Sequence, residues 1–202
     1  MKNTALLALA LMGAAALAGC DSKSKLAKEL QGEWSSTPEL LVNTGAARAS
    51  LVRVMDFSRT ADETQGTVTM TALITVDNTI QANDSIVTPL TITASGTAVI
   101  TGVYNVKDDD EVNLNLDATS LSISVDPEAV KLSYDIIDGN SGSSLEALRP
   151  GALRLAQQQI NRAAQEVFFN VDEIDDIRID GDMMSCEIGH KDLNFRRQAA
   201  GS

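Results

Sequence analysis

The strongest constraint in this sequence is a two-residue alternation of apolar and polar side chains. Between Val68 and Val76 every second residue is apolar, and threonines fill most of the positions between them. A β-strand points successive side chains to opposite faces, so the pattern predicts a strand with one face in a core and the other in water. The same alternation recurs in residues 90–106, 112–117, 120–125 and 130–136.

Residues typical of turns separate these segments, and they occur at Asp77-Asn78, Asn83-Asp84-Ser85, 108–110 and Asp126-Pro127. Gly96 and Gly102 fall inside the longest segment and suggest bulges or bends in a curved sheet. Short strands that each have one polar face favour antiparallel pairing. We therefore predict a mainly β fold, an antiparallel barrel, meander or sandwich of about 8–10 strands.

The period changes to that of a helix after a Gly/Ser/Asn-rich loop at residues 138–144. Leu153, Ala156 and Ile160 follow the 3.6-residue spacing of an amphipathic helix, which we expect to run from about Pro150 to Phe169.

Strands return after this helix. They are expected around residues 177–179, 184–188 and 193–195, and Asp180-Gly181-Asp182 fits a hairpin turn between the first two. Near the N-terminus, Leu26 and Leu30 are four apart, which predicts one or two helical turns that end at Gly32.

The first residues match the signal sequence of a bacterial lipoprotein. Lys2 is followed by the apolar stretch Ala5–Leu17, shorter than the roughly 20 residues of a spanning helix. The stretch ends in Leu17-Ala18-Gly19-Cys20, which resembles a lipobox. The resemblance implies cleavage before Cys20, a diacylglyceryl thioether on its sulfur and an acyl chain such as palmitate on its new amino group.

This resemblance divides the chain into a signal peptide (1–19), a lipidated tether (20–25), one domain (26–197) and a loose tail (198–202). It implies a protein anchored by lipid in the membrane of the cell envelope. Asp21 follows the lipidated position, and in enteric bacteria an aspartate there retains a lipoprotein in the inner membrane, on its periplasmic face. The outer membrane is the alternative location.

The segment Leu30-Gln31-Gly32-Glu33-Trp34 resembles the Gly-x-Trp opening of lipocalins and of bacterial lipocalin-like lipoproteins. The resemblance extends over most of residues 26–197. It implies that Trp34 closes one end of an antiparallel barrel and packs under an arginine of the last strand, either Arg196 or Arg197. The similarity is distant, because a lipocalin helix usually follows the barrel strands, whereas here it precedes the last ones.

The charge of the chain limits its partners. It carries 16 basic and 28 acidic residues, a net charge of -12, and loss of Lys2 with the signal peptide leaves -13. Such a charge repels nucleic acid and anionic membrane surfaces and attracts a basic protein. The alternative is that the negative charge only keeps the domain soluble. A single Trp, two Tyr and four Phe leave the core to aliphatic side chains.

No residue pattern predicts catalysis, and we expect neither an enzyme, a cofactor nor a metal site. His190 is the only histidine and falls in a turn sequence, so we expect it on the surface. Once Cys20 carries lipid, Cys186 has no partner for a disulfide, and it shares strand parity with Met184 and Ile188, which predicts burial. The acidic residues of 172–182 lack the spacing of an EF-hand, and 108–111 form a solvated turn.

Two functions fit these observations. The first is a non-catalytic, lipid-anchored binding module whose interior holds a small apolar ligand. The side chains on the inward face of the strands would line this interior: Val68, Met70, Ala72, Ile74, Ile92, Ile100, Tyr104, Leu114, Leu116, Leu132 and Tyr134. The alternative is a protein-interaction lipoprotein, an inhibitor or assembly factor, with a filled barrel and an acidic surface that docks a basic partner. An apolar pocket of roughly 300 Å³ or more would favour the first.

The anchor yields the first testable prediction. Cys20→Ser should abolish lipidation, because the thioether needs the cysteine sulfur. Metabolic labelling with a palmitate analogue measures this, and label that persists on the variant would contradict the lipobox assignment.

Overall fold

The computed structural model describes residues 22–60, 64–81, 89–134, 142–169 and 171–199. The described residues form one antiparallel sheet of 11 strands, with a long helix inserted before the last three. This confirms the predicted mainly β fold and the position of the helix. The strand number exceeds the expected 8–10, because residues 32–59, which the sequence analysis left undivided, form three strands. The residues up to 21, which include the signal sequence, Cys20 and Asp21, lie outside the described part.

The strands are β1 Gly32–Ser36, β2 Glu39–Asn43, β3 Ala47–Arg59, β4 Gln65–Ile80, β5 Leu90–Val106, β6 Val112–Leu116, β7 Ser122–Val125, β8 Lys131–Tyr134, β9 Glu173–Asp180, β10 Met183–Ile188 and β11 Lys191–Arg197. The helix α2 spans Gly142–Phe168, and two 3-10 turns, η1 Ala118–Ser120 and η2 Pro127–Ala129, flank β7.

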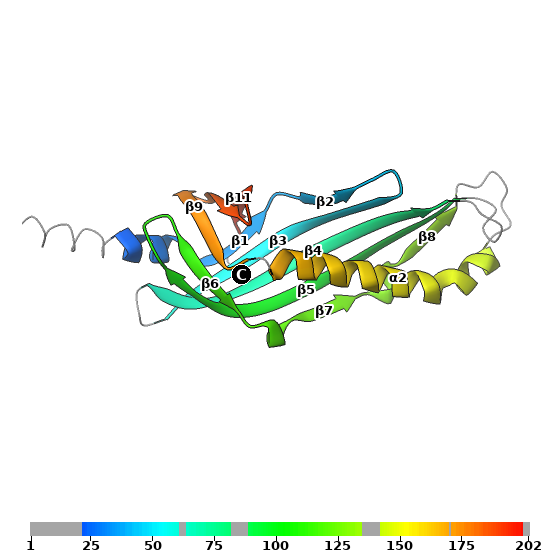
Figure 1. Cartoon of the computed structure of the whole chain (residues 1–202), viewed down its shortest axis with the longest axis horizontal. Coiled ribbons are helices and arrows are strands. Elements are labelled where there is room, and N and C mark those ends of the chain that lie inside the picture. Colours follow the sequence, from blue (N-terminus) through cyan, green and yellow to red (C-terminus); the bar gives the residue numbers. More distant parts are fainter. Residues whose placement is uncertain (1–21, 61–63, 82–88, 135–141, 170, 200–202) are drawn as a thin grey trace, which may run out of the picture.

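Part of this sheet closes into a ring. The strands follow the order β1-β11-β10-β9-β6-β5-β4-β3, and β1 also pairs with β3, which joins the two ends of that series. The three longest strands, β3, β4 and β5, continue beyond the ring as an open sheet (Figure 1). There β2 pairs with β3 at one side, while β7 and β8 pair with β5 at the other. The molecule is thus a closed ring at one end and an open sheet covered by α2 at the other (Figure 1).

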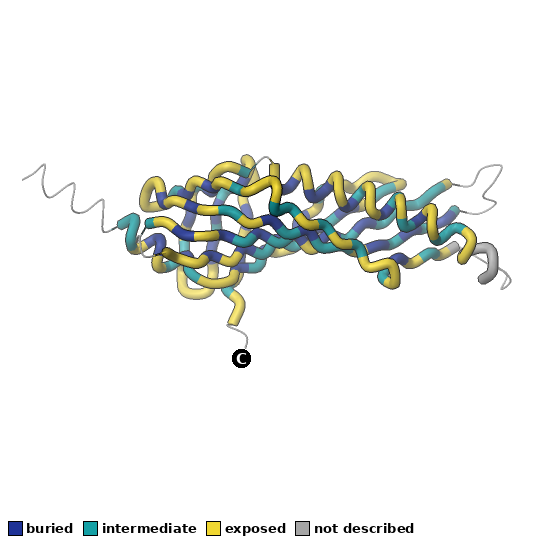
Figure 2. The backbone as a smooth tube through the Cα atoms, turned by 90° about the horizontal axis from the view of Figure 1, so that it is seen from below, coloured by how far each residue is buried: buried dark blue, intermediate teal, exposed yellow. Residues whose placement is uncertain are grey.

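The expected alternation of buried and exposed residues is confirmed. Val68, Met70, Ala72, Ile74 and Val76 are all at most 2% exposed, and the tube in Figure 2 alternates between buried and solvent-facing residues along the strands. This alternation places one continuous core inside the ring and beneath α2.

One predicted turn is wrong. Asp77 and Asn78 do not interrupt the chain but lie within β4, paired with β3 and β5. Their polar side chains are satisfied there, since Thr93 Oγ1 donates to Asp77 Oδ1 at 2.8 Å and Asn78 Nδ2 donates to Gln159 of α2. The turn expected at residues 83–85 lies outside the described residues. Residues 108–110 do form the bend between β5 and β6, and Asp126 caps η2.

Gly96 and Gly102, which were expected to mark bulges or bends, instead allow neighbouring elements to approach β5 closely. Pairing between β4 and β5 is continuous through both residues. A Cβ at Gly102 would lie 2.4 Å from the carbonyl oxygen of Asn115, and one at Gly96 would lie 2.9 Å from the side chain of Ile160 on α2. The two glycines therefore let β6 and α2 pack tightly on β5.

Both helices start earlier than the sequence predicts. α2 begins at Gly142, and Pro150 lies inside it instead of at its start. Proline removes one backbone hydrogen bond, but Leu148 packs on the core and Arg149 Nη1 donates to Val130 O at 3.1 Å, which holds the first turns in place. Residues 22–29 are helical, so the predicted tether is already structured from residue 22. No helix among the described residues is both long and apolar enough to cross a membrane.

The two predicted C-terminal turns are confirmed. Gly181 has φ 58° between β9 and β10, and Gly189 and His190 have φ 57° and 63° between β10 and β11. Two consecutive positive φ angles are those of a type I′ turn, whose twist matches that of paired strands.

Candidate functional site

The interior of the ring is filled by its own side chains. Within the ring, Val68, Met70, Ile100 and Tyr104, four residues of the predicted ligand lining, are each at most 1% exposed. A water-sized void beside them would leave accessible area on their atoms. Phe57 meets the Tyr104 ring edge-on at 5.3 Å between centroids. The ring interior is thus packed like an ordinary protein core.

The remaining residues of that predicted lining are not gathered in one cavity. Leu114, 7% exposed, belongs to the ring, and Leu116 is partly buried. Ala72 and Ile74 lie farther along β4, and Ile92 pairs with Leu132 in the open sheet. Tyr134 ends β8, and its side chain lies outside the described part.

Trp34 closes the ring at the end where the N-terminal helix packs. Its side chain is fully buried, and its Nε1 donates to Leu30 O at 2.8 Å. Of the two candidate arginines, Arg197 packs on it, with Cζ 4.0 Å from the indole centroid, while Arg196 is exposed. The Arg197 guanidinium also donates to Gln31 O and, at 2.7 Å, to Glu29 O.

Gly32 explains the Gly-x-Trp spacing at this closure. Its φ is +100°, a conformation that side chains rarely adopt, and it turns the chain from the helix into β1. The backbone carbonyls at the C-terminal end of helix 22–29 lack partners within the helix, and they face Arg197. A cation is favoured at this end of a helix. Of the four residues predicted to build this end of the ring, Gly32, Trp34 and Arg197 come together and Arg196 does not.

A buried ion pair lies where the ring opens into the sheet, and the sequence analysis missed it. Arg53 Nη2 is 3.1 Å from Glu39 Oε2 and Nε is 3.2 Å from Oε1, with the two side chains 5% and 7% exposed. Arg53 Nη1 also reaches Val167 O at 3.5 Å, at the end of α2. The signal was present, because Arg53 occupies the apolar parity of β3 between Leu51 and Met55.

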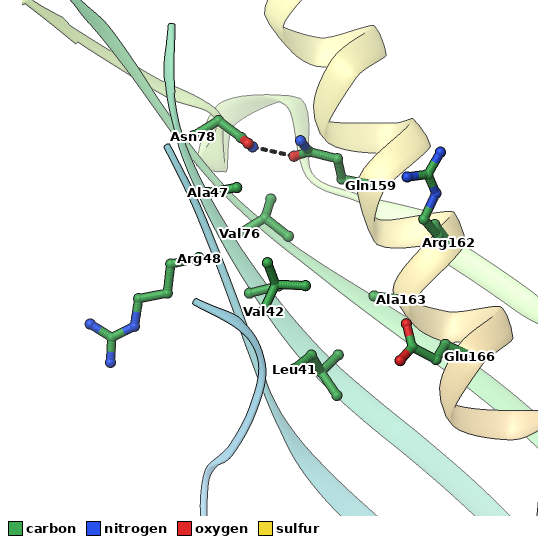
Figure 3. A pocket seen from close by; sticks show the side chains of 11 residues that line it. Leu41, Val42, Ala47, Arg48, Val76, Asn78, Gln159, Arg162, Ala163 and Glu166 are labelled. Atoms are coloured by element: carbon green, nitrogen blue, oxygen red, sulfur yellow. Dashed lines mark hydrogen bonds between the residues drawn. The ribbon is translucent and has the colours of Figure 1, made fainter. Parts of the chain in front are cut away.

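A groove runs between α2 and β2, and we call it the α2–β2 groove (Figure 3). Its cavity of about 160 Å³ has mostly apolar walls, contributed by Leu41, Val42, Ala47, Ala49, Val76 and Ala163. A neighbouring cavity of about 200 Å³ shares Leu41 and Glu166 with it and extends past Arg53 to Lys191. Small residues create this space, since alanines stand on both of its walls.

The groove has one closed end and a polar rim. The hydrogen bond from Asn78 to Gln159 joins sheet and helix at its end, and Glu166 points towards Leu41 across it (Figure 3). Arg162 stands on the exposed side of α2, while Arg48 points away from the helix (Figure 3). The arrangement is suited to binding a narrow apolar group, and among its lining residues there is no nucleophile beside a base.

The structure joins two acidic segments that are far apart in the sequence. Val112 pairs with Ile174, Leu114 N donates to Asp172 O at 2.7 Å, and Ile177 N donates to Asp110 O at 2.9 Å. We call the result the acidic surface, formed by Asp108, Asp109, Asp110, Glu111, Asp172, Glu173, Asp175 and Asp176. Asp182, grouped with them in the sequence analysis, lies instead beside Arg197, 3.7 Å from its Nε.

Repulsion between neighbouring carboxylates contributes to shifted pKa values on the acidic surface. The charge of Asp175 raises the pKa of Glu173, and partial burial together with Glu111 raises the pKa of Asp175. Lys107 pairs with Glu111, and this partner raises the lysine pKa. Carboxylate oxygens of Glu111, Glu173 and Asp175 lie within 4.8 Å of one another and are the donor type that a hard cation prefers.

Cys186 and His190 lie where the sequence predicts. Cys186 is 4% exposed inside the ring, and burial raises the pKa of its thiol to about 12, so it stays protonated at neutral pH. A protonated, buried thiol is a poor nucleophile. The His190 side chain is 99% exposed in its turn, with Nδ1 3.3 Å from Glu187 Oε1.

The closure predicts a clear order of stabilities. Trp34→Ala should reduce the free energy of unfolding by about 3 to 5 kcal/mol, because it empties a fully buried site. Arg197→Gln should cost more than Arg196→Gln, since only Arg197 contacts the indole and two carbonyls; Arg196→Gln should stay within about 0.5 kcal/mol. Chemical denaturation of residues 22–202 measures all three. A Trp34→Ala loss under about 1 kcal/mol would refute the closure.

The buried ion pair predicts a non-additive cycle. Arg53→Met alone should reduce the free energy of unfolding by about 3 to 5 kcal/mol, because Glu39 is left buried without a partner. The double variant Glu39→Leu/Arg53→Met removes both charges and should be more stable than either single variant. Denaturant unfolding of the four proteins tests this. Additive losses would mean that the two side chains do not depend on each other.

Comparison with known proteins does not assign a family, since no family model and no curated protein matches the chain.

Proposed function

We propose that this protein is a lipid-anchored, non-catalytic lipoprotein of the cell envelope that docks a basic protein through its acidic surface. The observation that carries the proposal is the union of two acidic segments, at the β5–β6 bend and at β9, into one surface. Electrostatic complementarity of this kind steers association and suppresses wrong partners.

The packed ring favours this proposal over a ligand carried inside the barrel. An interior ligand would have to displace side chains that are already fully buried against one another. Such side chains have no room for an apolar group unless the core rearranges. The ring therefore serves best as a rigid support for its outer surface.

The raised pKa values of Glu173 and Asp175 add a second argument. The charge of Asp175 is the main cause of the raised pKa of Glu173, whereas burial comes first for Asp175 and the charge of Glu111 second. Lys107 lowers the pKa of both groups, but the repulsion between the carboxylates exceeds this effect. A basic partner would relieve that repulsion and would gain the interaction that the isolated protein lacks.

The resemblance to lipoproteins supports a location of this surface close to a membrane. The lipobox at Leu17–Cys20 supports a lipid anchor immediately before helix 22–29, and the Gly-x-Trp closure supports a distant lipocalin-like origin for the ring. A filled ring with an acidic docking surface fits a protein that acts on its basic partner as an inhibitor or as an assembly factor.

Binding of a small apolar ligand is the second candidate function, but the ligand would bind in the α2–β2 groove and not inside the ring. The α2–β2 groove is mostly apolar but, at about 160 Å³, is smaller than a typical ligand pocket. Titration with an environment-sensitive fatty-acid probe examines it, and no binding up to roughly millimolar concentration would reject it.

The docking proposal predicts a specific loss of cross-linking. A photo-cross-linking residue in place of Asp172 should trap a basic protein in the envelope of the native host. Neutralising three exposed carboxylates of the acidic surface, Asp109→Asn, Glu173→Gln and Asp176→Asn, should abolish that product. The matched control is Glu33→Gln, Asp56→Asn and Glu128→Gln, which changes the net charge equally but lies elsewhere and should leave the product intact. Equal loss in both triple variants would refute the acidic surface as the docking site.

The same complex should dissociate as the pH falls. Protonation removes the attractive charge, and the raised pKa values of Glu173 and Asp175 move this loss above the range of ordinary carboxylates. These two groups bind protons more tightly in the native state than in the unfolded state, so their contribution to stability rises as the pH falls through that window. Circular dichroism recorded in parallel should therefore show an intact fold while binding is lost.

A further inference from the structure

Strand β2 is an unprotected edge of the sheet. In the described part of the chain it ends the strand order and pairs only with β3. The opposite side of the open sheet differs, because α2 packs on β7 and β8 as well as on β4 and β5. The strands on that side thus have the helix packed against them, whereas β2, the last strand of the order, has an unpaired backbone edge.

The exposed edge is also apolar. Leu40 is 50% exposed and Val42 is 39% exposed, so two of the six exposed large apolar residues among those described lie on this five-residue strand. Proteins usually protect an edge with lysines, proline or a bulge. A bulge at Leu41 is present, but no exposed charge lies on β2 itself, because Glu39 is buried with Arg53.

The α2–β2 groove adjoins this edge and provides room for side chains. Leu41 and Val42 form its wall on the strand side, and α2 forms the other (Figure 3). A strand added beside β2 would span about 17 Å over five residues and would direct every second side chain into the groove. The cavities of about 160 and 200 Å³ suit small aliphatic side chains better than aromatic ones.

The charges around the groove contrast with those of the whole chain. Arg48, Arg162 and Lys191 line the two cavities with Glu166 as the one exposed anion, and Arg53 is neutralised by Glu39. The chain as a whole has a net charge of -12. The groove is thus locally basic, and charge complementarity selects an acidic occupant.

We propose that β2 and the α2–β2 groove bind an extended acidic segment of a partner protein, which adds to the sheet as a further strand. Its apolar residues alternate with acidic ones, so that one set fills the groove while the other, on the opposite face of the sheet, meets Arg48, which points away from α2 (Figure 3). This surface is distinct from the acidic surface, and it takes a segment of the opposite charge.

A synthetic peptide tests the proposal. The probe is an acetylated, amidated and fluorescently labelled heptapeptide in which valine alternates with glutamate, and fluorescence anisotropy measures its binding to residues 22–202. Hydrogen exchange should slow at residues 39–43 when the peptide binds. A peptide of the same sequence with alternate amides N-methylated should bind at least tenfold more weakly, since it cannot complete the strand pairing.

Matched variants locate the site. Val42→Lys should weaken binding at least tenfold, whereas Leu73→Lys, at a 46% exposed residue of β4, should have no effect. Arg48→Gln should weaken binding more than Arg178→Gln, at an exposed residue of β9 far from β2 in the strand order. The carboxylate variants of the acidic surface should leave peptide binding unchanged, so the two proposals can fail separately.

Several results would overturn the inference. Equal binding of the N-methylated peptide would mean that the groove accepts side chains without strand addition. Absence of binding up to millimolar peptide would reject the site. A dimer that light scattering detects and Val42→Lys dissociates would show that a second copy of the chain occupies the edge instead.

Discussion

The fold depends on the double pairing of β1. This five-residue strand is hydrogen-bonded to β11 on one side and to β3 on the other, and without it the sheet would remain open. Closure removes two edges and allows Trp34, at the centre of β1, to be buried beneath Arg197. The same residues fix the end of helix 22–29, because Arg197 donates a hydrogen bond to Glu29 O and the Trp34 indole donates one to Leu30 O, directly after the helix.

The groove exists because closure stops partway along the strands. β3, β4 and β5 are more than twice as long as β1, so their far halves cannot be completed by it. α2 covers that open part but lies towards β7 and β8, and the alanines on its inner face bring it close to the sheet. The space left at β2 follows from this offset, and the buried pair of Arg53 and Glu39 lies beside the point where the ring ends and the groove begins.

The sequence predicts what local periodicity determines. Alternation identifies β4 and β5, and the helical period identifies α2. The indole–guanidinium contact was implied by the resemblance of Gly-x-Trp to the lipocalin opening, which left open whether Arg196 or Arg197 makes it. Features that depend on long-range pairing are not visible in this way. Asp77 and Asn78 have turn chemistry, yet strand pairing and contacts to Thr93 and Gln159 keep them in β4.

The candidate surfaces were predictable only in part, for the same reason. The acidic residues of 108–111 and 172–176 are evident separately, but only the pairing of β6 with β9 makes them one surface. Arg53 could have been identified as an inward-facing charge by its parity in β3, whereas its partner Glu39 could not, since that contact depends on the bulged pairing of β2. The edge itself is a property of strand order, which no local pattern contains.

The position of the proposed anchor connects these surfaces. Helix 22–29 begins two residues after Cys20 and packs against the closed end of the ring, so a lipid on Cys20 would hold that end towards the membrane. The acidic surface belongs to the ring, and an anionic bilayer would repel it within a Debye length of about 8 Å at physiological ionic strength. That repulsion would keep the domain away from the lipid surface and leave the acidic residues available to a basic protein. Helix α2 and strand β2, which line the α2–β2 groove, lie farther along the long axis (Figure 1), so a second partner could reach the groove without displacing the first.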